Sequence, residues 1–171
     1  MIKYGFTRSF LGLSPLERKE RAHYKIVITG ETIKHFIEML REAGLIHIAD
    51  EILRNQRIII VVCEDSVVRG VQVKSNLAPK LRYIYEKKVD GSLIKAEIHI
   101  RASFPELLSH CPFCTTTKKG ETLAESCPEI SQRIEFLGIN SLTYNTISDL
   151  VKILGIPKEN LCMDCALPPK E

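Results

Sequence analysis

Two short cysteine pairs are the residues whose types and spacing most clearly predict chemistry in this sequence. Cys111 and Cys114 form one C-x-x-C motif, and Cys162 and Cys165 form a second. A spacing of two residues lets both thiolates of a pair face one ion, and four thiolates suit tetrahedral zinc or an iron–sulfur cluster. We therefore expect these four cysteines to form one metal site, with residues 115–161 folding back between the two pairs.

Other roles for the cysteines stay open. The pairs could be redox-active or could be unrelated buried thiols, although neither lies between a first strand and a long helix, as a thioredoxin-like motif would. Cys127 is close to the site in sequence and could replace Cys114 as a ligand. Cys63 lies inside an apolar run and is expected in the core. His110 could support the metal site or be an ordinary surface histidine.

An acidic pair follows the most apolar run of the chain. Residues 58–63 are all apolar and mostly β-branched, which predicts a parallel strand covered by helices on both faces. Glu64 and Asp65 come next, and ligands of open α/β sheets bind outside the carboxyl ends of the strands. The two carboxylates could bind ribose hydroxyls or Mg²⁺, and Gly70 could let backbone N–H groups approach a phosphate. The alternative is a solvated acidic turn.

The elements around these motifs alternate between strand and helix, which predicts an α/β fold. Strands are expected at residues 24–29, 58–63 and 96–102. Helices are expected between Thr32 and Gly44, around residues 48–53, after Gly70, after Pro128 and over residues 147–154. Pro79 should kink or delay the helix after Gly70, because proline lacks the N–H that a helix interior requires.

Bulk composition excludes several classes of protein. A chain of 171 residues with 44% hydrophobic residues can form one domain with a buried core. The net charge of +3 is too small to argue for nucleic-acid binding. No apolar run is long enough to span a membrane, and the start of the sequence has no signal-peptide core, so a cytoplasmic location is expected. An incomplete sheet would expose an edge, which favours a homo-oligomer.

Together these motifs resemble the C-terminal part of the phosphoribosyltransferase domain of glutamine amidophosphoribosyltransferases, which belong to the type I phosphoribosyltransferases and catalyse the first committed step of purine synthesis. Residues 59–70 look like the phosphoribosyl pyrophosphate signature of that family. Further segments resemble its later strands, loops and cysteine pair, and its mobile active-site loop: residues 97–101, 105–112, 118–123, 141–145 and 161–165, and residues 4–8 with 14–15. The match covers roughly residues 1–22 and 57–167.

The resemblance implies a truncated phosphoribosyltransferase-like α/β core with a parallel sheet over residues 1–107, with inserted helices at residues 30–55. It implies a small cysteine-rich metal-binding subdomain over residues 108–171. It also implies phosphoribosyl pyrophosphate or a nucleotide as ligand, with Mg²⁺ as a possible cofactor. The expected ligand-binding residues are Glu64, Asp65, Arg69, Gly70 and Gln72.

In cluster-bearing members of the family, cysteines like Cys111, Cys162 and Cys165 bind a [4Fe–4S] centre. Their fourth ligand comes from an upstream segment that is not found here. The resemblance therefore makes Cys114, or alternatively Cys127, the expected fourth ligand. It favours an iron–sulfur cluster modestly over zinc.

Three departures from the family weaken the expectation of catalysis. The sequence as given has no glutaminase segment, and the first half of the transferase domain, with its pyrophosphate loop, is missing. Val71 stands where the family usually has threonine, and a phosphate oxygen left without that hydroxyl would lose about 1–3 kcal/mol. We therefore assign no catalytic residue and expect a partner protein that could supply the missing part.

Two other functions are compatible with the residues. The chain could be a non-catalytic metal-binding module that acts as a regulatory subunit or scaffold. It could also be a zinc-dependent nucleic-acid binder, because paired C-x-x-C motifs and the basic residues Lys118 and Lys119 occur together, although the chain has no basic stripe.

Overall fold

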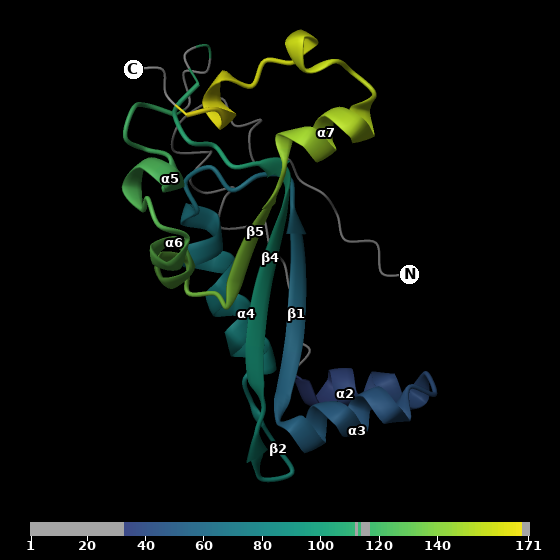
Figure 1. Cartoon of the computed structure of the whole chain (residues 1–171). Coiled ribbons are helices and arrows are strands. Elements are labelled where there is room, and N and C mark those ends of the chain that lie inside the picture. The colour runs from purple at the N-terminus through teal and green to yellow at the C-terminus, as the bar shows by residue number, and fades with distance from the viewer. Residues whose placement is uncertain (1–32, 112, 114–116, 169–171) are drawn as a thin grey trace, which may run out of the picture.

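The centre of the fold is a three-stranded parallel sheet in the order β1–β4–β5 (Figure 1). The computed structural model describes residues 33–111, 113 and 117–168. Within them β1 spans Arg57–Glu64, β4 spans Lys95–Pro105 and β5 spans Ser141–Asn145. The predicted α/β class with a parallel sheet is confirmed. The strand expected at residues 24–29 and the cap expected at Thr32 lie outside the described residues.

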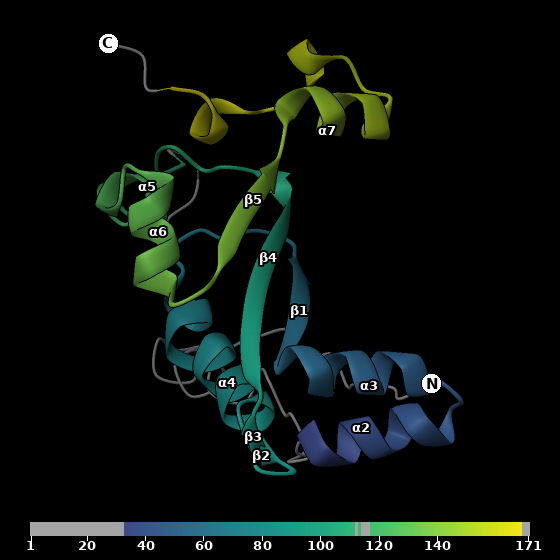
Figure 2. The ribbon, with the colours of Figure 1, turned by 60° about the horizontal axis from the view of Figure 1, so that its bottom comes forward.

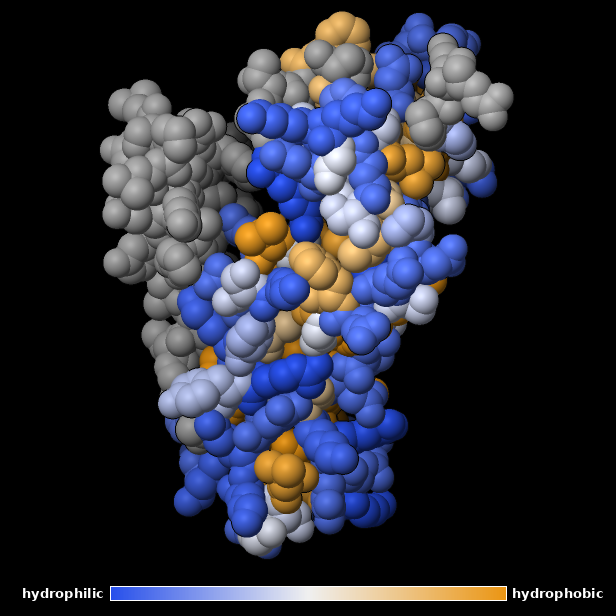
Figure 3. All heavy atoms as spheres, turned by 90° about the vertical axis from the view of Figure 1, so that its left-hand side faces the viewer, coloured by the Kyte–Doolittle hydropathy of each residue, from blue (hydrophilic) through white to orange (hydrophobic). Residues whose placement is uncertain are grey.

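Two helices cover one face of this sheet. Helix α4 (Ala78–Tyr85) and helix α6 (Ile130–Leu137) lie on the same side of the strands in Figures 1 and 2. Alternate residues of β4 point toward them, because successive strand side chains face opposite sides. The outer surface of these helices is mainly hydrophilic (Figure 3). The core between helices and sheet includes Leu77, Ala78, Leu81, Ile98, Ile100, Leu137, Ile139 and Leu142.

The opposite face of β1 is not covered as the sequence predicted. Ile59 is 54% exposed and Val61 is 57% exposed, and Cys63, which was expected in the core, is exposed on the same face. The prediction of helices on both faces is therefore wrong for the described part of the chain, because an apolar strand does not reveal what is available to cover it.

The amino end of the sheet has a second small core. Helices α2 (Ile33–Glu42) and α3 (Ile46–Asn55) form the two helices that were predicted there, and they lie where β1 begins (Figures 1 and 2). Gly44 has a φ of +76° between them, which favours glycine. The buried members of this core are Ile33, Ile37, Ala49, Ile52, Ile58, Val89, Ile94 and Ala96. A short hairpin of β2 (Lys88–Val89) and β3 (Ser92–Leu93) closes it.

The helix after Gly70 begins at Val71, so Pro79 does not delay it, although the helix is irregular just before the proline. A π-helical turn, η2 (Val73–Leu77), precedes α4, and Pro79 follows within the first turn of α4. Proline cannot donate a backbone hydrogen bond, so a wider turn before it lets the chain continue without a break. Val73 and Leu77 remain buried on the sheet side despite the irregularity.

The chain after β4 returns to the carboxyl end of the sheet. Short helix α5 (Leu123–Ser126) begins with a capping box, in which Thr122 and Glu125 satisfy each other's backbone N–H groups. After β5, the chain continues through α7 (Ile147–Leu154) and the 3-10 turns η3 (Lys158–Asn160) and η4 (Asp164–Ala166). Figures 1 and 2 both place α7 at the end where the three strands finish. None of the helices in the described ranges is long and apolar enough to cross a membrane.

A buried arginine fastens α6 to the end of β4. Arg133 is 5% exposed; it donates from Nε to the carbonyl of Cys127 over 2.6 Å and binds the carboxylate of Glu106 and the carbonyl of Pro128. Each of the three guanidinium nitrogens therefore has an acceptor, which offsets the cost of burying the charge. Burial raises the pKa of the neighbouring Tyr144 to about 12; Arg133 opposes this rise and the Glu106 carboxylate adds to it.

Replacing Ile98 by alanine should destabilise the fold strongly. Ile98 is fully buried at the centre of β4, and such a truncation leaves a cavity that costs about 2–5 kcal/mol. The matched control is Ile153→Ala, because Ile153 is 73% exposed on α7 and its truncation should change stability by less than about 0.5 kcal/mol. Urea unfolding followed by circular dichroism measures both. Equal losses for the two variants would contradict this core.

Tyr144 should ionise later than an ordinary tyrosine. Its raised folded-state pKa means that its contribution to stability is present below the ordinary value of 10 and is lost as the pH rises toward about 12. A rapid alkaline titration of tyrosinate absorbance should show a late step that Tyr144→Phe removes. If every tyrosine ionises near pH 10 while the circular dichroism stays native, this burial is wrong.

Candidate functional site

A pocket of about 300 Å³ lies at the carboxyl end of the sheet. Its lining residues come from two neighbouring strand ends: Asp65 and Ser66 follow β1, and Phe104 and Leu107 lie at and after the end of β4. This is the position where ligands bind in open α/β sheets. The pocket therefore lies beside the acidic pair that the sequence singled out.

Hydrogen bonds between strand ends fix the shape of this edge. The Phe104 N–H donates to the carbonyl of Asp65 over 3.0 Å, and the Ser103 hydroxyl lies 3.2 Å from the carbonyls of both Glu64 and Asp65. The Asn145 amide, at the end of β5, donates to the Ser103 carbonyl over 3.2 Å. Ser103 and Asn145 were not singled out from the sequence. The sequence feature that could have identified them is their position as polar residues at the ends of two predicted strands.

The two acidic residues differ in their surroundings. Glu64 is the last residue of β1 and is half-buried, whereas Asp65 is exposed and accepts a 2.7 Å hydrogen bond from the N–H of Ser66. This hydrogen bond engages one carboxylate oxygen of Asp65 in the turn. Asp65 also lines the pocket. The pair can therefore offer carboxylate oxygens to hydroxyl groups or to a divalent cation.

The loop after the acidic pair is held tightly at its far end. Gly70 has a φ of +69°, and a Cβ atom there would lie 2.4 Å from Cδ2 of Leu137. No side chain fits this position without displacing the core of α6. The loop is also fastened in its middle, because Leu123 donates its N–H to the carbonyl of Val68 over 2.7 Å. The backbone from residue 66 to residue 70 therefore has a fixed course past the pocket.

The other predicted ligand residues are spread along this loop. The guanidinium of Arg69 lies 3.5 Å from the carboxylate of Glu121 on the exposed surface. Gln72 is half-buried immediately before the π-helical turn. Val71, which replaces the family's usual threonine, is 55% exposed. The structure thus brings Glu64, Asp65 and the loop together at one edge, while Arg69 is occupied by an ion pair.

The cysteine segments meet near the same end of the molecule. The N–H groups of Leu108 and Ser109 both donate to the carbonyl of Cys165, over 2.8 and 3.1 Å. Burial raises the pKa of the Cys165 thiol, and the neighbouring Cys111 and Cys162 thiols raise it further. Cys111 and Cys162, two of the other predicted metal ligands, therefore both lie near Cys165.

A metal site is not formed by the described residues as they lie. Within residues 33–111, 113 and 117–168, no three cysteine, histidine, aspartate or glutamate side chains are arranged to hold a metal ion. Cys114 lies outside the described residues. Cys127, the alternative ligand, is half-buried and packs against the main core, and its carbonyl accepts the hydrogen bond from Arg133. Thiolate donors suit both zinc and iron–sulfur clusters, so the donor set fits either group.

His110 directly precedes Cys111 in the chain. Its Nδ1 is buried without a hydrogen-bond partner in the described structure and lies 3.9 Å from the Glu125 carboxylate. Burial tends to raise the pKa of Glu125, but hydrogen bonds from Thr122 and Gly120, together with His110, hold that pKa below its ordinary value. This arrangement joins helix α5 to the segment that carries Cys111.

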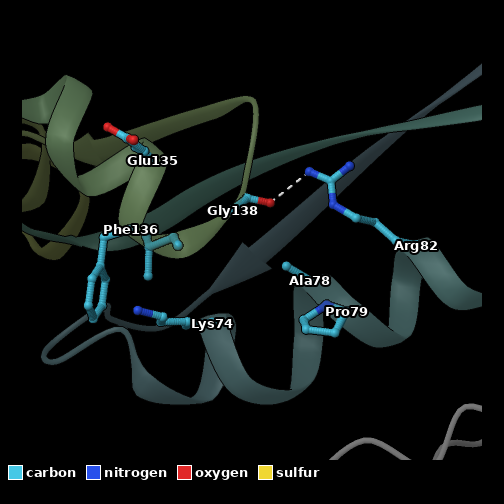
Figure 4. A pocket seen from close by; sticks show the side chains of 8 residues that line it. Lys74, Ala78, Pro79, Arg82, Glu135, Phe136 and Gly138 are labelled. Carbon is cyan, nitrogen blue, oxygen red and sulfur yellow. Dashed lines mark hydrogen bonds between the residues drawn. The ribbon is translucent and has the colours of Figure 1, made fainter.

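A second pocket, of about 320 Å³, lies between η2–α4 and the end of α6 (Figure 4). The ammonium of Lys74 lies 3.8 Å from the centre of the Phe136 ring, and Arg82 donates to the Gly138 carbonyl over 2.7 Å. Both cations are used by the protein itself, and Arg82 satisfies the carboxyl end of α6. We therefore interpret this pocket as part of the contact between two helices.

Sequence comparison links the chain to amidophosphoribosyltransferases. It is 26% identical over 148 residues to amidophosphoribosyltransferase 1, chloroplastic, of Arabidopsis thaliana, covering 85% of this chain and 23% of that protein. It is 27% identical over 106 residues to the amidophosphoribosyltransferase of Methanothermobacter thermautotrophicus, covering 62% and 20%. It is 29% identical over 92 residues to the human amidophosphoribosyltransferase, covering 54% and 16%.

No family model matches the chain. The chain spans less than a quarter of the length of these curated relatives, so the similarity concerns one part of them. The resemblance that the motifs predicted is confirmed: the chain is similar to amidophosphoribosyltransferases over a partial, phosphoribosyltransferase-type region.

Proposed function

We propose that this protein binds a phosphoribosyl ligand, either phosphoribosyl pyrophosphate or a nucleotide, in a role related to purine biosynthesis. The observation that carries the proposal is the acidic pair Glu64–Asp65 beside the 300 Å³ pocket, followed by a loop whose course is fixed at Gly70. The similarity to amidophosphoribosyltransferases supports the choice of ligand.

The proposed binding mode follows from the chemistry of the edge. Glu64 and Asp65 accept hydrogen bonds from the vicinal hydroxyls of ribose or bind Mg²⁺, and the backbone of residues 66–70 approaches the 5-phosphate. Carboxylates there act as positioning groups rather than as acid–base catalysts, since phosphoribosyl transfer depends largely on orientation and electrostatic stabilisation. A protein partner could supply the pyrophosphate-binding part of a complete transferase site.

We further propose that Cys111, Cys114, Cys162 and Cys165 bind a [4Fe–4S] cluster, with zinc as the alternative. The proposal is supported by the nearness of Cys111 and Cys162 to Cys165 and by the two hydrogen bonds that fasten the Cys165 carbonyl to residues 108–109. Such a group would supply a covalent link between two distant chain segments and would thereby stabilise the fold.

Removing the charge of Asp65 should weaken binding of phosphoribosyl pyrophosphate. Titration calorimetry with Mg²⁺ should show a dissociation constant raised by roughly 10- to 100-fold for Asp65→Asn, because a hydrogen bond to a charged group contributes about 1.5–3 kcal/mol. Asp90→Asn is the matched control. Asp90 is exposed in the β2–β3 turn with a φ of +50°, which asparagine also tolerates.

The same titration separates the proposed functions. If the folded wild-type protein releases no heat with phosphoribosyl pyrophosphate or nucleoside monophosphates, the ligand proposal is wrong. Metal content without such heat would instead favour a non-catalytic metal-binding regulatory or scaffold module. Turnover of phosphoribosyl pyrophosphate by the chain alone would exclude the non-catalytic module.

Replacing Cys162 by serine should remove the bound metal and lower thermal stability. Anaerobic purification followed by a visible spectrum and metal analysis should show iron and sulfide in the wild-type protein and little of either in Cys162→Ser. Cys63→Ser is the control, because Cys63 is an exposed thiol on β1. A colourless protein with one zinc would reject the cluster, and a metal-free wild-type protein would reject the site. Comparing Cys114→Ser with Cys127→Ser identifies the fourth ligand.

A further inference from the structure

The outer edge of β1 has backbone groups that point away from the sheet. Within the described residues, β1 pairs only with β4. The Lys95 N–H donates to the Gln56 carbonyl over 2.9 Å, which shows that Gln56 faces β4. Because the backbone groups of successive strand residues point in alternate directions, the even-numbered residues of β1 face β4 and the odd-numbered ones face outward. The outward-facing N–H and C=O groups belong to Arg57, Ile59, Val61 and Cys63.

This edge lacks the features with which proteins usually protect a free strand. Residues 58–63 carry no charge and no proline. The pairing of β1 with β4 is continuous over residues 57–64, so no bulge twists the edge away. Ile59 and Val61 are more than half exposed on the sheet face opposite α4, which we call the open face. Such an edge favours the addition of a strand from another chain.

We propose that two copies of this protein pair along the outer edges of their β1 strands. The strands run antiparallel and are related by a two-fold axis that passes beside Ile60, perpendicular to the sheet. The two three-stranded sheets then join into one sheet of six strands. The inference depends neither on the proposed ligand nor on the proposed metal.

The side chains of β1 are self-complementary in this register. Opposite residues of an antiparallel pair point to the same face of the sheet and contact each other. With the axis at Ile60, Ile59 lies opposite Val61 of the second copy on the open face, and Ile58 lies opposite Val62 on the covered face. The exposed side chains of Ile59 and Val61 therefore gain apolar neighbours. This match of the edge with itself favours a second copy over an unrelated partner.

The hydrogen-bonding groups of the edge agree with the same register. Two opposite residues that face each other across an antiparallel pair exchange two hydrogen bonds, so the four outward-facing residues of each copy form about eight. At the ends, Arg57 lies opposite Cys63 of the second copy and Glu64 lies opposite Gln56, so no two like charges meet. An axis at Val61 would leave Arg57 without an opposite residue in β1.

Helices α2 and α3 leave the plane of the strands free. Figures 1 and 2 show them extending past β1 on the side away from β4. They share a core with Ile58 and Ala96, and Ala96 points to the same sheet face as Ile98, which packs with residues of α4. The two helices therefore belong to the helix layer, and a strand of the second copy can lie beside β1 below them.

The native thiol of Cys63 allows a direct test in the full-length protein. Under mild oxidation, Arg57→Cys should form a disulfide with Cys63 of the second copy, because the Cα atoms of a hydrogen-bonded pair lie about 5.5 Å apart. Within one chain, positions 57 and 63 are about 20 Å apart and cannot be linked. Ile59→Cys is the matched control on the same edge and should link at least tenfold less. Adding Cys63→Ser to Arg57→Cys should abolish the link, as mapped by peptide mass spectrometry.

A proline in the edge should separate the two copies. Val61→Pro should remain folded, because the Val61 N–H faces away from β4 and proline is tolerated at such a position. Analytical ultracentrifugation should show a wild-type dimer whose dissociation constant rises at least tenfold in this variant. Ile60→Pro is the matched control. Its N–H faces β4, so circular dichroism should show that this variant loses stability of the sheet itself.

Three results would overturn the proposal. A wild-type protein that stays monomeric at every accessible concentration would show that the edges do not pair. Equal linking from positions 57 and 59 would exclude the register. In the unmodified protein, the amides of Ile59 and Val61 should exchange more slowly with deuterium as the protein concentration rises. Slow exchange of these amides in the monomer would show that the edge is covered within one chain, whether or not the variants fold.

Discussion

The parallel pairing of β1 with β4 determines where the candidate ligand groups lie. The register places Glu64 opposite Ala102, so β1 ends just before the point where Phe104 donates its N–H to the Asp65 carbonyl. The central position of β4 is in turn fixed by Ile98, which is fully buried under the helices. The geometry of the acidic turn is therefore a consequence of core packing and strand register. A shift of one residue would move every side chain of β1 to the other face.

The loop beside the pocket depends on a part of the chain that lies far away in sequence. Gly70 is packed so closely against Leu137 that a methyl group would not fit, and the Val68 carbonyl accepts the first N–H of α5. Helices α5 and α6 thus form the outer support of the loop. The edge with the acidic pair and helices α5 and α6 are therefore one structural unit.

Sequence patterns predicted the elements whose signals are local. The β-branched run of β1 and the alternation of β4 are each contained within a few residues, and each was found where it was expected. The exposed face of β1 could not be predicted, because burial depends on which elements the rest of the chain supplies. Ser103 and Asn145 were missed for a related reason: their role arises from register between strands that lie about forty residues apart.

One short segment connects the two candidate sites physically. Phe104 and Leu107 line the pocket, Glu106 is bound by the buried Arg133, and the N–H groups of Leu108 and Ser109 hold the Cys165 carbonyl. These attachments follow one another so closely that ordering either end of the segment restricts the backbone at the other. Fixing a residue costs about 1–2 kcal/mol of conformational entropy, and a segment already fixed at one end needs less at the other. Loss of the contacts at Cys165 would therefore loosen the backbone next to Leu107, so the pocket wall and the cysteine segment share their stability.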